Sequence, residues 1–174
     1  GYDKDLLMKD VNIEVESGQT VAIVGPTGAG KTTLMNLLLR FYDVKGGAIK
    51  IDGVDIRDMK REDLRSLFSL VLQDTWLFSG SIYDNIRYGR LDARKDEIIS
   101  AAKMANVHHY IRTLTKGYDS LINEEANNIS QGEKQLLTIA RAILKDPQIL
   151  ILDEATSSVD TRLERRLQEA MHRV

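Results

Sequence analysis

A glycine-rich octapeptide near the start of the chain limits what this sequence can fold into. It fits the pattern G-x-x-x-x-G-K-S/T, follows the apolar run 21–24 and precedes a segment, 33–41, whose apolar residues have helical spacing. Glycines let the backbone turn tightly, so that successive N–H groups point inward and form a nest for an anion. The octapeptide therefore predicts a phosphate-binding loop between a strand and a helix, made of Gly25, Pro26, Thr27, Gly28, Ala29, Gly30, Lys31 and Thr32.

Two side chains of this loop suit a nucleoside triphosphate. The Lys31 ammonium is expected to reach the β- and γ-phosphates, and the Thr32 hydroxyl is expected to bind Mg²⁺. The helix that begins near Gly30 adds its positive dipole end, and Thr33 in its first turn is a further candidate contact. The alternative is a glycine-rich turn before an ordinary helix, but the strand–loop–helix context favours nucleotide binding.

Bulk composition narrows the class of protein. The chain has 174 residues, 43% hydrophobic and 29% charged, which is typical of a globular protein with one core. The net charge of −2 gives no basic bias toward nucleic acid. There is no cysteine, which excludes disulfides and thiolate metal sites. No apolar run approaches the ~20 residues of a membrane-spanning helix, so we expect any membrane connection to come through another polypeptide region.

The first 72 residues alternate strand and helix signals. Periodicity predicts a half-buried strand at 11–15, a buried strand at 20–24 and a helix over 33–41. Asp52-Gly53 between two apolar runs predicts a hairpin of strands 48–51 and 54–56. A short charged helix is expected at 61–67, and an apolar strand at 69–72.

The segment that follows is helical in pattern. Helical spacing covers 81–88, 94–105 and 107–114, with one apolar stripe formed by Ile98, Ala101, Ala102 and Ala105. Ser130 and Glu133 fit the capping-box pattern S-x-x-E, which predicts a helix that stops before Pro147. An apolar strand at 148–152, of the composition found in buried parallel strands, and a charged helix at 160–174 complete the chain. We predict an α/β core, in parts 1–72 and 146–174, with residues 73–145 inserted as a helical subdomain.

A pair of acids ends the last strand. Asp153 and Glu154 follow four apolar residues, which places their carboxylates at the carboxyl end of a strand, where ligands of open α/β sheets bind. Asp153 is expected to hold Mg²⁺ together with Thr32, and Glu154 is expected to orient or deprotonate an attacking water. The alternative, a strand end that simply meets solvent, leaves the pairing with the phosphate loop unexplained.

A third motif is more specific. Residues 128–135 read N-I-S-Q-G-E-K-Q and resemble the signature motif, commonly L-S-G-G-Q, of ATP-binding cassette (ABC) proteins. Gln73-Asp74 resembles the Q-loop of that family, and the stretch 76–86 is similar to that of exporter cassettes. Glu124-Glu125-Ala126 occupies the position of the X-loop, and 157–160 resembles the D-loop. The resemblance spans essentially the whole chain.

The resemblance implies a P-loop NTPase core with an antiparallel β segment and the inserted helical subdomain. It implies that Tyr2 stacks on adenine and that Gln73 contributes to the metal site and to catalysis. It also implies head-to-tail pairing with a second nucleotide-binding domain, identical or different, in which Ser130 and Gly132 bind the partner's ATP. The cofactors implied are ATP and Mg²⁺.

The signature departs from the family pattern at two positions. Gln131 replaces the commoner first glycine and Glu133 the commoner glutamine. Because a carboxylate beside a γ-phosphate costs Coulomb energy, we expect Glu133 to point away from the nucleotide and to cap its helix. The family's switch histidine is expected beyond Val174, and neither His172 nor the pair His108-His109 is assigned to a site.

Together these features predict the nucleotide-binding domain of an ABC exporter, an ATP hydrolase whose cycle drives transmembrane domains from the cytoplasmic face of the cell membrane. Contact with those domains is expected through the region near Gln73, the stretch 74–86 and the X-loop. The main alternative is a soluble ABC-type ATPase acting on nucleic acid or ribosomes, but the long coiled-coil or basic insertions of such proteins are missing from this sequence. A small-molecule kinase gives 128–135 no purpose, and a catalytically silent cassette does not fit Lys31, Asp153 and Glu154.

Overall fold

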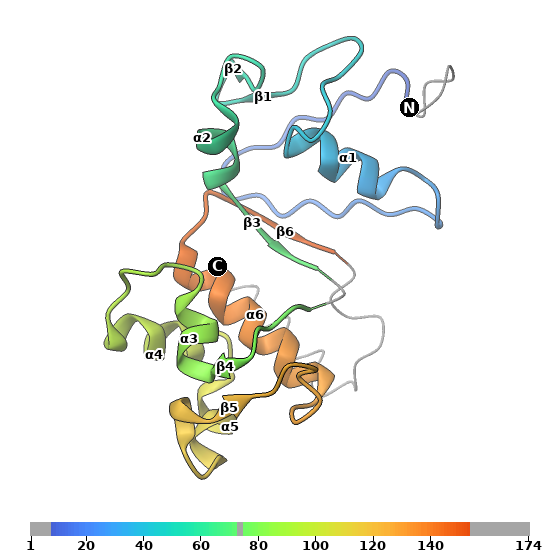
Figure 1. Cartoon of the computed structure of the whole chain (residues 1–174). Coiled ribbons are helices and arrows are strands. Elements are labelled where there is room, and N and C mark those ends of the chain that lie inside the picture. The colour runs from blue at the N-terminus through green and yellow to red at the C-terminus, as the bar shows by residue number, and fades with distance from the viewer. Residues whose placement is uncertain (1–7, 73–74, 154–174) are drawn as a thin grey trace. The chain divides into compact units, whose positions relative to one another are not determined.

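A computed structural model describes residues 8–72 and 75–153 (Figure 1). The chain divides into two units, Gly1–Leu64 and Arg65–Val174, and each is described by itself. The predicted sites at Tyr2, Gln73 and Glu154, the D-loop and the helix 160–174 lie outside the described residues. Within the described ranges, no helix combines the length and the hydropathy needed to cross a membrane.

The described part of the first unit contains helix α1, one hairpin and the start of helix α2 (Arg61–Ser66). Helix α1 (Lys31–Leu38) follows the glycine-rich loop, and strands β1 (Lys50–Ile51) and β2 (Val54–Asp55) pair in antiparallel fashion. The turn residues Asp52 and Gly53 have φ of 49° and 81°, as a two-residue primed hairpin turn requires. The predicted hairpin is confirmed. The predicted helix is confirmed as well, although it ends at Leu38, before Phe41.

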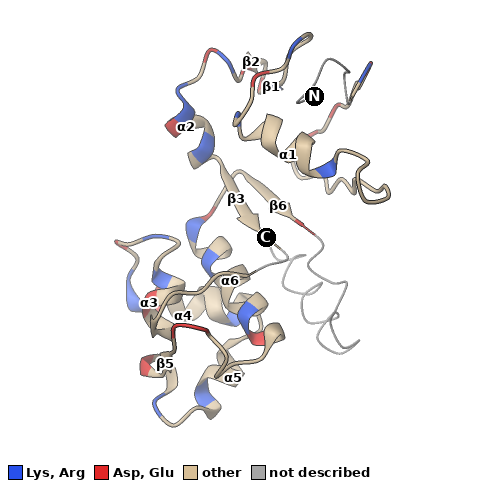
Figure 2. Cartoon of the chain, turned by 45° about the vertical axis from the view of Figure 1, so that its right-hand side comes forward, with Lys and Arg blue, Asp and Glu red and all other residues tan. Residues whose placement is uncertain are grey.

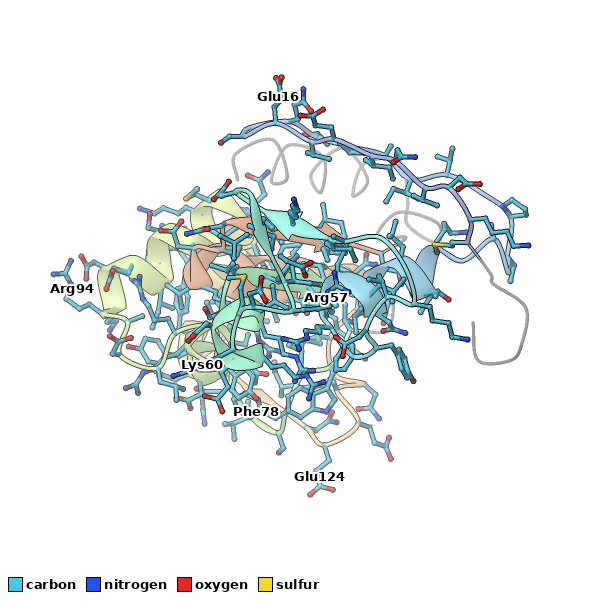
Figure 3. All side chains as sticks on the ribbon, turned by 90° about the horizontal axis from the view of Figure 1, so that it is seen from above. Glu16, Arg57, Lys60, Phe78, Arg94 and Glu124 are labelled. Atoms are coloured by element: carbon cyan, nitrogen blue, oxygen red, sulfur yellow. The ribbon has the colours of Figure 1, made fainter. Side chains whose placement is uncertain are left out.

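Two predicted strands of this unit are wrong. Residues 11–15 and 20–24 are extended but belong to no ladder, and their apolar side chains are about half exposed or more, as Val11 (51%) and Val24 (88%) show. A strand requires a neighbour for its backbone N–H and C=O groups, and none of the described residues pairs with these segments. Alternation favours an extended backbone but cannot supply that neighbour. Figure 3 shows Glu16 at the bend of this segment, with its side chain pointing away from the ribbon.

Helix α2 (Arg61–Ser66) leads into the second unit, whose sheet is a parallel pair. Strand β3 (Phe68–Val71) aligns with β6 (Ile149–Leu152), with Phe68 opposite Ile149 and Val71 opposite Leu152. Both strands are confirmed and are free of charged residues, as Figure 2 shows by their tan colour. β6 is half-buried along its length rather than buried on both faces as predicted, because β3 is its one neighbour among the described strands.

The rest of the second unit is helical. It contains α3 (Ile82–Arg87), α4 (Lys95–Met104), α5 (His108–Thr113), the 3₁₀ turn η1 (Gly117–Asp119) and α6 (Gln131–Lys145). A short antiparallel pair, β4 (Gly80–Ser81) and β5 (Leu121–Ile122), joins the segment before α3 to the segment after η1. The four α-helices predicted among the described residues of this unit are confirmed within one or two residues of their expected ends.

Helix α6 lies at the centre of this unit. It packs against α3, α4 and β3, and its inward face is buried at Gly132, Gln135, Leu136, Leu137, Thr138, Ile139, Ala140, Ala142 and Leu144. The predicted stripe of α4 packs into the same core, with Ile98 and Ala102 fully buried. Burying each large aliphatic side chain contributes about 1.5–3 kcal/mol, so this core dominates the stability of the unit. The helix ends at Lys145, and its C-cap Asp146 adopts the left-handed conformation directly before Pro147.

Candidate nucleotide-binding site

The phosphate loop has the backbone that its glycines predict. Gly28 and Gly30 have φ of 86° and 95°, a region open to glycine at little cost, and Gly30 forms the N-cap of α1. A Cβ on Gly25 would lie 2.9 Å from the Cβ of Ala29, so the close approach of these two residues depends on glycine. The loop is exposed along residues 25–29. A tight, exposed turn therefore precedes the helix.

Lys31 points back into its own loop. Its Nζ donates hydrogen bonds to the carbonyl oxygens of Gly25, at 2.6 Å, and Pro26, at 3.2 Å. An ammonium group has three N–H donors, which leaves one without a partner among the described residues. The positive charge is thus held at the rim of the loop, with a donor available to an anion.

The first turn of α1 offers further N–H donors. The first intrahelical bond runs from the Leu34 N–H to the Gly30 carbonyl, at 2.9 Å, so the N–H groups of Lys31, Thr32 and Thr33 precede the helical ladder. By contrast, the Ala29 N–H donates to the Pro26 carbonyl at 3.1 Å and is used inside the loop. Thr32 is exposed, so its hydroxyl is accessible. The arrangement is suited to bind a phosphate.

This unit also contains a cavity that does not coincide with the phosphate loop. It encloses about 860 Å³ and is lined by 8–12, 42–49 and the α1 residues Thr33, Leu34 and Leu37. Part of its wall is the extended segment that was predicted to be a strand, so the cavity marks the space beside an unpaired backbone. It includes Thr33 but not Lys31, and we assign no ligand to it.

In the second unit, Asp153 stands where the sequence places it. Its N–H donates to the Val71 carbonyl at 2.9 Å, which continues the β3–β6 ladder by one residue and fixes Asp153 at the carboxyl ends of both strands. Carboxylate and hydroxyl oxygens are hard donors of the kind Mg²⁺ prefers, so the side chains of Asp153 here and of Thr32 in the first unit each have the chemistry of a Mg²⁺ ligand.

In the described part of the chain, neither His108 nor His109 belongs to a group of side chains that could hold a metal. His108 Nδ1 lies 2.8 Å from the Tyr118 hydroxyl, and burial together with the charges of Lys103 and Arg112 lowers its pKa. Burial also raises the pKa of Tyr118 to about 12. The described part of the chain contains no group of three or more histidine and acidic side chains that could hold a metal.

The signature turn caps α6 in part as predicted. The Ser130 hydroxyl accepts a hydrogen bond from the Glu133 N–H at 3.3 Å. The reciprocal bond, in which the Ser130 N–H would donate to the Glu133 carboxylate, is not formed in the described part of the chain, so the capping-box prediction is half wrong. Instead, the carboxylate is near Tyr110, whose pKa is raised first by burial and then by this charge. Ser130 and Gln131 are exposed, and Gly132 is buried.

Sequence reasoning missed Arg141. Its guanidinium is largely withdrawn from solvent, which lowers its pKa, and it donates hydrogen bonds to backbone and side-chain oxygens of the 76–85 region. One signal could have found it. Arg141 lies four residues after Leu137 and three before Leu144, both buried, so a cation falls on the inward side of an amphipathic helix.

The loop before α1 and the parallel pair that ends in Asp153 are features of the P-loop NTPase class. The family model described as "ABC transporter" matches residues 8–157. The chain therefore belongs to the ABC transporter family.

Relatives and a solved structure agree with this assignment. The chain is 57% identical over 165 residues, 95% of its length, to a fatty acid ABC transporter ATP-binding/permease protein of Mycobacterium tuberculosis, of which it covers 26%. It is 54% identical over its whole length to an ABC transporter ATP-binding protein of Bacillus subtilis, of which it covers 29%. A bacterial Atm1-family ABC exporter solved with ATP bound matches 99% of the chain, with a TM-score of 0.91 and 44% identity. The chain covers 30% of that exporter chain, so it spans less than a third of the proteins it matches.

Proposed function

We propose that this chain is the nucleotide-binding domain of an ABC exporter, which binds Mg-ATP and hydrolyses it to power transport. The observation that carries the proposal is the exposed glycine loop with Lys31 held at its rim by the Gly25 and Pro26 carbonyls. The names of the relatives, ATP-binding/permease proteins and exporters, support the transport role. They do not favour the alternative of a soluble ATPase that acts on nucleic acid or ribosomes.

The triphosphate would bind over the loop and the first turn of α1. The N–H groups of Lys31, Thr32 and Thr33 and the remaining Lys31 ammonium donor would contact phosphate oxygens, since these donors precede the helical ladder. The Ala29 N–H would have to leave the Pro26 carbonyl before it could join them. Adenine would stack on Tyr2, by the family resemblance.

Thr32, Asp153 and Gln73 would hold Mg²⁺. The ion would neutralise charge on the β- and γ-phosphate oxygens. Asp153 would accept from metal-bound water or bind directly, and its backbone N–H places it at the carboxyl end of the β3–β6 pair. Glu154, the next residue, would orient and deprotonate the attacking water.

A second nucleotide-binding domain would complete the site. Ser130 and Gln131 are exposed at the N-terminal end of α6, where helix N–H groups attract anions. Ser130 and Gly132 would bind the partner's ATP, with Gly132 contributing backbone alone because it is buried. The proximity of Glu133 to Tyr110 is compatible with a carboxylate directed away from that ATP.

Transmembrane domains would dock on the second unit, so the assembly would lie at the cytoplasmic face of the cell membrane. Trp76 and Tyr88 are 61% and 56% exposed beside Phe78, which gives the stretch 75–88 an apolar outer surface. At the X-loop position, Figure 3 shows the Glu124 side chain pointing away from its loop. Exposed aromatic groups are typical of protein interfaces.

The test of ATP binding is the substitution Lys31→Ala in the full-length protein. Removing an ammonium that binds phosphate costs about 1.5–3 kcal/mol, so the Kd for a fluorescent ATP analogue should rise roughly 10- to 150-fold. The exposed Lys45, in the same unit, supplies the matched control: Lys45→Ala should leave the Kd unchanged. Equal affinities for wild type and Lys31→Ala would contradict the proposed site.

Hydrolysis is tested separately by Glu154→Gln. Loss of a positioned general base should slow ATP turnover about 10²- to 10⁴-fold, while the amide keeps the size of the side chain and leaves ATP binding intact. Steady-state phosphate release and equilibrium nucleotide binding, measured on the same preparation, separate the two effects. Unchanged turnover would remove Glu154 from the mechanism.

A further inference from the structure

We propose that Arg141 is a positioning residue that links the signature end of α6 to the exposed aromatic surface formed by Trp76, Phe78 and Tyr88. The proposal rests on the proposed function, because it assigns α6 the task of carrying a change at the nucleotide site to the docking surface. It concerns contacts within the second unit alone.

Arg141 holds two separate segments to α6 with its planar fork. Its Nη1 donates to the Trp76 carbonyl at 3.0 Å, and its Nε donates to the Asn85 carbonyl at 2.9 Å. Its Nη2 donates to the Asn85 Oδ1 at 3.1 Å. A guanidinium presents donors in a fixed geometry that a lysine cannot reproduce. The position of residues 76 and 85 relative to α6 therefore depends on this side chain.

Asn85 extends the linkage to Phe78. Its side chain is 1% exposed, and its amide closes a ring with the backbone of Phe78, accepting from the N–H at 3.1 Å and donating to the carbonyl at 3.0 Å. A further bond reaches the Ser81 carbonyl at 3.0 Å. Every polar atom of this buried amide is satisfied. The segment 76–78 is thus attached to α6 through Arg141 directly and through Asn85.

The same guanidinium also contacts two rings of the aromatic surface. Its central carbon lies 5.9 Å from the centroid of the Trp76 ring and 5.2 Å from that of Tyr88, within range for attraction between a cation and a ring. The three rings also contact one another, with centroids 5.8–6.2 Å apart. Next to Tyr88, a Cβ on Gly89 would lie 2.2 Å from the Arg141 carbonyl oxygen, so this loop approaches α6 as closely as glycine permits.

The other end of α6 carries the signature. Ser130 caps the helix, and Arg141 lies eleven residues further on, roughly 16 Å along the axis at 1.5 Å per residue. The buried face between them makes this stretch of helix move as one body. At the near end, the Gln131 Nε2 donates to the Thr75 Oγ1 at 3.3 Å. α6 therefore contacts adjacent residues 75 and 76 from two points, and a displacement of Ser130 would reach the aromatic surface.

A purely structural role for Arg141 makes a different prediction. A residue that only fills the core would change stability without changing how the aromatic surface responds to nucleotide. The substitution Arg141→Lys separates the two roles, because it keeps the charge and much of the volume but loses the fork. The matched control is Arg90→Lys, since Arg90 pairs with Glu97 rather than with the 75–85 segment.

The experiment is hydrogen exchange, read peptide by peptide, on the full-length transporter in lipid nanodiscs, with and without Mg²⁺ and the non-hydrolysable analogue adenylyl imidodiphosphate. In the wild type and in Arg90→Lys, we expect exchange across 75–91 to change on nucleotide addition. In Arg141→Lys, we expect basal exchange at 75–79 to rise roughly tenfold, since charged hydrogen bonds are lost, and the nucleotide-dependent change to disappear. Nucleotide affinity should stay within about twofold in all three, because Arg141 is not placed at the phosphate loop.

The outcomes distinguish this inference from the proposed function. Absence of nucleotide binding by the wild type would overturn the proposed function. Binding without any change at 75–91, or a change of equal size in Arg141→Lys, would overturn the role of Arg141. If Arg141→Lys does not fold, Gln131→Ala tests the second contact at an exposed position. It should reduce the nucleotide-dependent change at 75–79, and an undiminished change would count against the linkage.

Discussion

The interactions that stabilise the first unit differ from those that stabilise the second unit. In the first unit, α1 buries no residue, and the loop before it owes its shape to glycine backbone angles and to hydrogen bonds from Lys31. In the second unit, nine residues of α6 are buried, and the polar side chains of Asn85 and Arg141 are hydrogen-bonded to specific partners. A site that binds a phosphate needs exposed donors, whereas a surface that transmits a displacement needs rigid packing. The contrast fits the two tasks that we propose for these units.

The difference between the units should be largest in the effect of substitutions on the free energy of unfolding. Leu137→Ala should lower the free energy of unfolding by about 2–5 kcal/mol, because the side chain is fully buried and leaves a cavity. Thr27→Ala, in the exposed phosphate loop, should change it by less than about 0.5 kcal/mol. Denaturant unfolding followed by circular dichroism measures both. Similar losses for the two variants would show that the loop is held by packing after all.

The two serine N-caps, Ser81 and Ser130, should differ in their effects on stability and on ATP turnover. The Ser81 hydroxyl accepts from the Asp84 N–H at 2.9 Å, whereas the Ser130 hydroxyl accepts from the Glu133 N–H at 3.3 Å. Ser81→Ala should cost about 1 kcal/mol of stability, and Ser130→Ala should cost less, since its bond is longer. The order should reverse for ATP turnover in the full-length protein, where Ser130→Ala should be the more damaging. Equal effects on turnover would leave Ser130 as a cap alone.

The smallest expected effect is a pH dependence in the second unit. Burial lowers the pKa of His108 below its unfolded value of about 6.5. The folded state therefore favours the neutral ring, and this contribution to stability is complete above pH 6.5 and is lost as the pH falls toward the folded pKa. Melting temperatures at pH 7.5 and 5.5 should differ less for His108→Gln than for the wild type. An identical difference in the two proteins would mean that His108 does not contribute.

Local patterns predicted most of the second unit, for an identifiable reason. Its helices carry their own signals in apolar spacing, in the Ser130 cap and in Pro147, and each signal needs only neighbours along the chain. The strands predicted at 11–15 and 20–24 depended on partners elsewhere, which periodicity does not identify. The β1–β2 hairpin was predictable because Asp52 and Gly53 encode both the turn and the partner.

Some features of the candidate site were also predictable from local sequence, and others were not. The glycine loop and the acid at the end of β6 were readable, since their spacing reflects backbone geometry that the structure reproduces. The return of Lys31 to the Gly25 carbonyl and the use of the Ala29 N–H inside the loop were not, because both depend on the fold of the loop itself. Arg141 was missed because its hydrogen-bond acceptors lie on segments distant in sequence. Without them, a cation on the inward face only interrupts the apolar pattern of the helix.

We expect the phosphate loop of one copy and the signature turn of another to enclose one ATP. The direct measurement is disulfide cross-linking between a copy carrying Ala29→Cys and one carrying Gln131→Cys, in the Glu154→Gln background of a transporter otherwise free of cysteine. A link between copies should form with Mg-ATP and not without it. A link that forms equally without nucleotide, or one that forms only within a single copy, would contradict this shared site.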